Sequence, residues 1–198
     1  LLRGHPPETG PRAALIPMPW FARRIVALVC LAVLALPAAA LTDDDVSVDY
    51  RDGTYIGSLS VRTPAPVPVV MAVLTDFNGM ADFMPGLTSS RIIVHSGNQY
   101  QIEQKGKISF GPFSMPFESL RQIEVIDGKH IVSKSLAGSA RRMQSLMQVQ
   151  ALDHGSQIDY RIEIEPASWI PSSLGINFLQ HELAEQFNAL GKEMLRRK

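Results

Sequence analysis

Between residues 88 and 166, apolar and polar positions alternate with a period of two over most of the chain. The segment SQIDYRIEIEP, residues 156–166, is the clearest case, because its isoleucines and tyrosine share one face while its charged residues take the other. One apolar and one polar face is typical of an antiparallel sheet that is covered on a single side. Turn residues divide this region at four points and predict a meander of five strands: Ser96-Gly97-Asn98, Asp127-Gly128, Ala137-Gly138 and Asp153-His154-Gly155.

The region before the meander predicts a hairpin followed by two short helices. Apolar and small residues alternate around Asp52-Gly53, which is a strong signal for a hairpin turn. A proline-led segment then has apolar residues at helical spacing up to Phe77, and Asn78-Gly79 is expected to end that helix. Residues 80–84 supply about one further helical turn, which Pro85-Gly86 stops.

The last segment predicts one long amphipathic helix. Ser172 or Ser173 can cap it after Pro171, and residues 174–197 would extend about 36 Å at about 1.5 Å per residue. Its apolar stripe consists of Ile176, Leu179, Leu183, Phe187, Leu190 and Met194. A helix of this length can cross a whole sheet, so its stripe is expected to cover the apolar face of the meander.

The first forty residues have a different character. Arg23 and Arg24 precede an apolar run, which Pro37 and three alanines follow. A basic start, a short apolar core and an A-x-A cleavage site are typical of a secretory signal peptide. We therefore predict a non-native or disordered extension at residues 1–17, a signal peptide at 18–40 and one domain at 41–198. The expected location is secreted or periplasmic, and the alternative is a membrane anchor through an uncleaved N-terminal segment.

Composition narrows the classes of partner. Residues 1–40 hold four of the 19 Lys and Arg residues and one of the 19 Asp and Glu residues, so the predicted domain has a net charge of −3. A protein that neutralises phosphates needs a basic face, which argues against nucleic acid as a partner. The single cysteine, Cys30, leaves with the signal peptide. The domain therefore has no disulfide and no thiol nucleophile, and its hydrophobic core must hold it together.

Several stretches of the chain resemble the START-like (SRPBCC) superfamily, in particular its polyketide cyclase/dehydrase and coenzyme Q-binding branch. They are the proline-led helix that reaches Asp76-Phe77, the short helix after it, the strand pair FGPFSMPFESLRQIEV, the strand SQIDYRIEIEP and the helix from Leu174. The resemblance covers residues 46–197 and implies an α+β helix-grip fold, a curved antiparallel sheet wrapped around a long C-terminal helix. It also implies a cavity between sheet and helix, with Phe83 and Met84 near its mouth.

One charged residue interrupts the alternation. In MPFESLRQIEVI, Arg121 falls in the apolar phase with Ile123. An inward guanidinium is costly unless it is paired, so one interpretation makes Arg121 the anchor of a ligand with an acidic or carbonyl-bearing head, assisted by Gln104 and Tyr160. The other interpretation, which we prefer from sequence, is a bulge near Leu120 that turns Arg121 into water.

The predicted domain carries no recognised catalytic set, cofactor motif or metal-ligand spacing. Its four histidines lie in different predicted elements, so we predict no catalytic residue, no metal and no cofactor. We favour a non-enzymatic carrier of a hydrophobic small molecule such as a lipid or a quinone. The candidate ligand-binding residues are Met84, Phe110, Phe117, Arg121, Met143, Met147, Tyr160, Phe178 and Leu183.

Two alternatives stay open. A cyclase-, dehydratase- or hydrolase-type enzyme would use the same cavity, and it would need inward groups such as Arg121, Tyr160 or His181 to converge on one point. A protein-interaction module would need an exposed apolar patch. A transient membrane contact is compatible with an apolar ligand, and the sequence does not define the oligomeric state.

The signal peptide generates the first testable prediction. Because the cleavage pattern ends at Ala40, exported protein should begin at Leu41. N-terminal sequencing of protein recovered from the periplasm or the medium measures this directly. Recovery of exported protein that still begins at Met18 would show an uncleaved anchor.

Overall fold

The computed structural model describes residues 40–110 and 113–198. The predicted extension at 1–17 and all but the last residue of the predicted signal peptide lie outside the described residues. The predicted domain at 41–198 lies within them, apart from residues 111 and 112.

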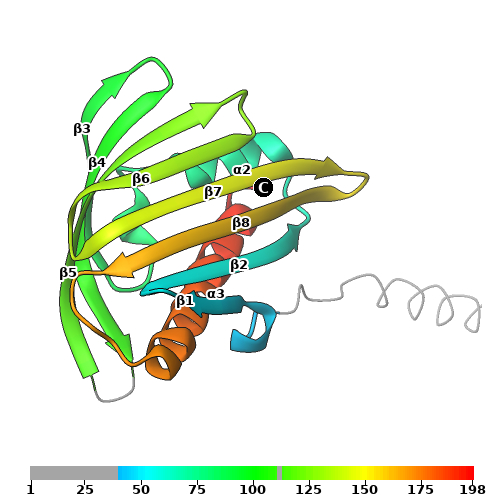
Figure 1. Ribbon diagram of the computed structural model, residues 1–198. Coiled ribbons are helices and arrows are strands. Elements are labelled where there is room, and N and C mark those ends of the chain that lie inside the picture. The colour runs from blue at the N-terminus through cyan, green and yellow to red at the C-terminus, as the bar shows by residue number, and fades with distance from the viewer. Residues whose placement is uncertain (1–39, 111–112) are drawn as a thin grey trace, which may run out of the picture. The chain divides into compact units, whose positions relative to one another are not determined.

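The described chain forms one antiparallel sheet and two α-helices, with two short 3₁₀ helices beside them (Figure 1). In chain order the elements are η1 (Asp43–Asp45), β1 (Ser47–Arg51), β2 (Thr54–Thr63), α2 (Val67–Leu74), η2 (Met80–Asp82), β3 (Leu87–Ser96), β4 (Gln99–Phe110), β5 (Phe113–Ile126), β6 (His130–Gly138), β7 (Ala140–Leu152), β8 (Gly155–Pro166) and α3 (Ser172–Arg196). The strand order is β1-β2-β8-β7-β6-β5-β4-β3. Figure 1 shows this sheet curving around α3, which confirms the predicted α+β helix-grip arrangement.

Within the described residues the meander contains six strands, one more than the sequence predicted. The additional break falls between Phe110 and Phe113, which are paired at the end of the β4–β5 hairpin. The sequence there reads Gly-Pro, a turn dipeptide, but it is flanked by phenylalanines that continue the apolar pattern. The β4–β5 hairpin and the first turn of α3 lie at the same end of the sheet (Figure 1).

The β1–β2 hairpin forms where the sequence predicted it. Asp52 has a φ of 48° and Gly53 a φ of 82°, so both central residues adopt the left-handed conformation. A turn of this kind matches the right-handed twist of the flanking strands, which explains why an Asp-Gly pair stands there.

The first helix ends earlier than predicted. Helix α2 stops at Leu74, where the Thr75 hydroxyl donates a hydrogen bond of 2.7 Å to the carbonyl of Met71. Phe77 lies beyond the helix but is only 2% exposed, and its ring packs edge-on against Tyr100 at 5.1 Å. Burial of Phe77 therefore does not require the helix to continue, and the break lets the chain turn towards β3.

Helix α3 packs its apolar stripe on the concave face of the sheet. Its buried residues are Gly175, Leu179, Leu183, Ala184, Phe187, Leu190, Glu193 and Met194. The predicted serine cap is wrong, because Pro171 is the N-cap residue and Ser172 and Ser173 belong to the first turn. The helix comes very close to β2, where a Cβ placed on Gly57 would lie 2.9 Å from Leu183 Cδ1.

The position of Leu183 generates the second prediction. Its side chain is 2% exposed, so Leu183→Ala should lower the free energy of unfolding by about 2–5 kcal/mol through lost burial and a residual cavity. Glu185 on the exposed side of the same helix is the control, and Glu185→Ala should change it by less than about 0.5 kcal/mol. Urea denaturation of both variants measures the difference, and equal effects would show that the other face of α3 is buried.

Candidate ligand-binding site

The concave face of the sheet is fully covered at one end and only partly covered at the other. Helix α2 lies near β7 and β8, and α3 comes closest to β1 and β2. The concave residues Val149 of β7 and Ile158 of β8 are each 1% exposed. Further along the same strands, and on β5, the concave residues are only half-buried: Phe117, Ser119, Arg121, Met143, Ser145, Met147 and Tyr160. The concave face over β5–β8 is therefore incompletely covered, and this half-buried region is called the hollow below.

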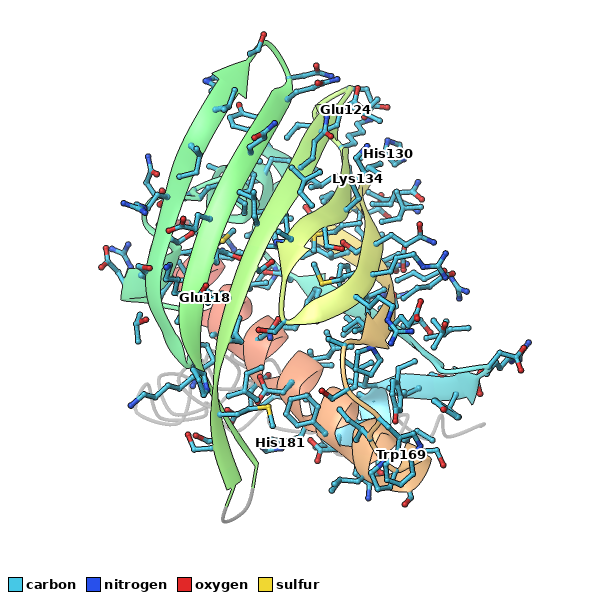
Figure 2. All side chains as sticks on the ribbon, turned by 60° about the vertical axis from the view of Figure 1, so that its left-hand side comes forward. Glu118, Glu124, His130, Lys134, Trp169 and His181 are labelled. Carbon is cyan, nitrogen blue, oxygen red and sulfur yellow. The ribbon has the colours of Figure 1, made fainter. Side chains whose placement is uncertain are left out.

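Arg121 lies on the concave face of β5, contrary to the bulge that we preferred from sequence. Its pairing with β4 is continuous, and it stands opposite the fully buried Ile102. A bulge does occur next to Leu120, but it belongs to β6, because Leu120 pairs with Ala137 and Arg121 with Ser135. The additional residue is on the partner strand, so the alternation of β5 is unchanged. Side chains such as Glu118 and Lys134 project from the opposite face (Figure 2).

Arg121 begins a chain of hydrogen bonds that reaches the break between α2 and η2. Its Nη2 donates to Oε1 of Gln104, which is 6% exposed on β4. The Gln104 amide nitrogen donates to Ser90 Oγ at 3.1 Å and to Met80 Sδ at 3.4 Å. Ser90 donates in turn to the carbonyl of Phe77. The guanidinium is thereby linked through three strands to the segment that follows α2.

Two polar atoms on this face are enclosed and have no hydrogen-bond partner among the described residues: Nε of Arg121 and Oγ of Ser133. Burial lowers the pKa of Arg121, and the neighbouring Tyr160 partly opposes that shift. Burial likewise raises the pKa of Tyr160, against a hydrogen bond with Ser145 and the charge of Arg121. The Tyr160 ring also packs against Phe187 of α3, at 5.2 Å between centroids. The concave face thus carries a polar strip of arginine, tyrosine and serine side chains, each of which can donate a hydrogen bond.

At the other end of α3, ion pairs join the helix to the break after α2. Arg197 pairs with Asp76 at 2.7 Å and with Glu193 at 2.6 Å, and its guanidinium lies 5.6 Å from the centre of the Phe83 ring. A groove of about 530 Å³ runs beside this cluster, between the η2 segment and α3. Its lining residues include Phe83, Met84, Asn188 and Lys192.

The nine candidate residues do not all lie at one place. On the concave face are Phe117, Arg121, Met143, Met147 and Tyr160. Met84 lines the groove beside η2 instead, and Leu183 is core, packed on Gly57 and Ile162. Phe178 is half-buried on α3, and the side chain of Phe110 lies outside the described residues.

Sequence reasoning missed Ser133. In HIVSKSLAG the apolar residues Val132 and Leu136 occupy the convex phase and are 39% and 45% exposed, whereas Ser133 faces inward. The usual rule that apolar residues face the core would have chosen the wrong face of β6. Only the pairing with β5 and β7 reveals the inward serines.

A family model described as "Polyketide cyclase / dehydrase and lipid transport" matches residues 63–190, which is more than half of the chain. The chain belongs to this family. The match confirms the resemblance that the sequence suggested. It includes α2, the six strands of the meander and most of α3, so the concave face and the helix over it belong to the family's shared domain.

Solved structures agree on the fold of this family member. A START superfamily protein from Mycobacterium smegmatis has a TM-score of 0.64 at 11% identity, over 72% of this chain and 99% of that one. The Zhui aromatase/cyclase from Streptomyces sp. R1128 has a TM-score of 0.61 at 14% identity, over 73% of this chain and 96% of that one. A STAR-related lipid transfer protein fragment from Xanthomonas axonopodis has a TM-score of 0.59 at 15% identity, over 77% of this chain and 99% of that one. No curated protein matches the chain.

Residues 40–110 and 113–198 contain no group of three or more His, Cys, Asp or Glu side chains arranged to hold a metal ion. In that part of the chain, no helix combines the length and the apolar character that crossing a bilayer requires.

The cluster at the end of α3 generates a prediction on pH. Hydrogen bonds from Arg196 and then Arg197 lower the pKa of Glu193 from 4.5 to about 2. The stabilisation of the folded state by the ionised Glu193 carboxylate is therefore complete above the unfolded pKa of 4.5 and is lost as pH falls towards 2. Denaturation curves should show a loss of stability over this range that is smaller in Glu193→Gln. An unchanged pH dependence in that variant would assign the loss to other carboxyls.

Proposed function

We propose that this protein is a secreted or periplasmic carrier that binds a hydrophobic, lipid- or quinone-like small molecule between the sheet and α3. The observation that carries the proposal is the half-buried concave face over β5–β8. Two methionines, Met143 and Met147, are partly exposed there although they point inward. Partly exposed apolar surface on an inward face is surface that a ligand can remove from water, at about 25 cal/mol per Å².

The side chains in the hollow suit a flexible apolar molecule. Methionine is unbranched and polarisable, so it adapts to ligands of irregular shape. Phe117 and Tyr160 add aromatic surface on either side of the two methionines, on β5 and β8. The description of the matching family, which includes lipid transport, is consistent with such a ligand.

Export is proposed on two grounds. The first is the signal-peptide pattern of residues 18–40. The second is the position of Leu41, the first residue of the expected mature chain. Its backbone N–H and carbonyl each form a 2.8 Å hydrogen bond with the Asn188 side chain on α3, so a chain that begins there is already fixed to the domain.

The alternative is a cyclase-, dehydratase- or hydrolase-type enzyme in the same hollow, favoured by the proximity of Arg121 and Tyr160. A base must be deprotonated near neutral pH to accept a proton. Burial moves the pKa of Tyr160 upwards, so its phenol keeps its proton and serves as a hydrogen-bond donor. Arg121 is a donor as well. The pair is therefore better suited to holding an acceptor group than to removing a proton.

A ligand-induced thermal shift tests the carrier proposal. Fatty acids and isoprenoid quinones should raise the melting temperature, because a ligand at a hundredfold excess over its Kd contributes about 2.7 kcal/mol. Met147→Trp should abolish the shift by filling the hollow while the protein stays folded.

The matched control for this test is Leu146→Trp, which places the same side chain one residue away on the convex face, where Leu146 is 46% exposed. It should keep the ligand-induced shift. Absence of any shift in the wild type, or a shift that survives Met147→Trp, would contradict binding in this hollow.

A further inference from the structure

The charge of Arg121 is not balanced by any carboxylate among the described residues. All ion pairs of that part of the chain are formed by other side chains, and the interactions of Arg121 are with the neutral Gln104 and Tyr160. A buried cation without a counter-ion costs several kcal/mol unless an anion joins it. The hollow therefore has an uncompensated positive charge on its wall.

The two unpartnered atoms belong to neighbouring strands, β5 and β6. Arg121 pairs with Ser135 across the β5–β6 ladder, and Ile123 pairs with Ser133, so Arg121 and Ser133 are diagonal neighbours on the concave face. Residues in this relation have Cβ atoms about 7–8 Å apart or less, which a long arginine side chain spans easily. Nε of Arg121 and Oγ of Ser133 are enclosed and both can donate a hydrogen bond.

Two donors on neighbouring strands, one of them charged, select among polar head groups. A neutral ketone or ester carbonyl can accept their hydrogen bonds but leaves the positive charge unbalanced. A carboxylate has two acceptor oxygens and one negative charge, so it satisfies both donors and neutralises the guanidinium. The Gln104 side chain already occupies another donor of Arg121, which fixes the orientation of the guanidinium before the ligand arrives.

We propose that the ligand of this hollow is an apolar molecule with a carboxylate head, and that the carboxylate binds Arg121 and Ser133. This inference rests on the proposed carrier function and adds the chemical class of the head group. The hydrocarbon part of the ligand then lies along Phe117, Met143 and Met147, towards the half-buried end of the concave face.

The test compares acids with their uncharged esters. Laurate and methyl laurate provide a linear pair, farnesoate and methyl farnesoate an isoprenoid pair, and dodecyl phosphate a different anion. Dissociation constants are measured by isothermal titration calorimetry with wild-type protein, Arg121→Met and Ser133→Ala. Lys134→Met is the control, because it removes a nearby positive charge from the exposed face of β6.

In the wild type, at least one acid should bind about tenfold or more tightly than its ester and more tightly than dodecyl phosphate, since hydrogen bonds between charged groups are stronger than those to a neutral carbonyl. Arg121→Met should remove this preference with little effect on the ester, and Ser133→Ala should reduce it severalfold. Lys134→Met should keep it.

The possible failures are distinct. Esters that bind as tightly as acids, tighter binding of the phosphate, or a preference that survives Arg121→Met would overturn the carboxylate inference and leave the carrier function intact. Absence of binding by all five compounds would overturn both. The acid-to-ester comparison and Ser133→Ala decide the question if Arg121→Met does not fold.

Discussion

The close contact between α3 and β2 determines the rest of this structure. At Gly57 the strand has no side chain, and Leu183 of the helix lies where a Cβ would point. A second close approach occurs at Gly175, where the Tyr55 ring occupies the equivalent space. These two glycines draw the helix towards the β1–β2 edge of the sheet. Because one helix cannot cover eight strands, its position at one edge leaves the concave face of β5–β8 less covered.

The residues in the less covered region differ from ordinary core residues. A core that only had to be stable would place apolar side chains at Arg121, Ser133 and Gln104, since buried polar groups cost free energy unless all of them are paired. Here Gln104 is well bonded, but one atom of Arg121 and one of Ser133 are not. Departures from core-packing rules are expected where a protein binds something, and here they coincide with the hollow.

Periodicity was sufficient to predict most of the fold. The alternation of β8 and β4, the Asp52-Gly53 hairpin and the stripe of α3 follow from burial on one face, which is a local property of the sequence. The errors occurred where a local pattern had two interpretations. The phenylalanines Phe110 and Phe113 concealed the end of β4 and the start of β5, and the burial of Phe77 suggested a longer helix than the one that forms.

The site was less predictable than the fold, because it depends on how neighbouring strands pair. Whether Arg121 faces inward is decided by which strand carries the bulge beside Leu120, and a single sequence does not contain that information. The positions of the β6 serines, in contrast, follow from the hairpin itself. Pairing between β5 and β6 is regular from the Asp127-Gly128 turn as far as Arg121 and Ser135, and the bulge lies just beyond that pair. This register puts Ser133 and Ser135 on the same face as Ile123 and Arg121, so a polar strip reaches the concave face although Val132 beside it is exposed on the convex side.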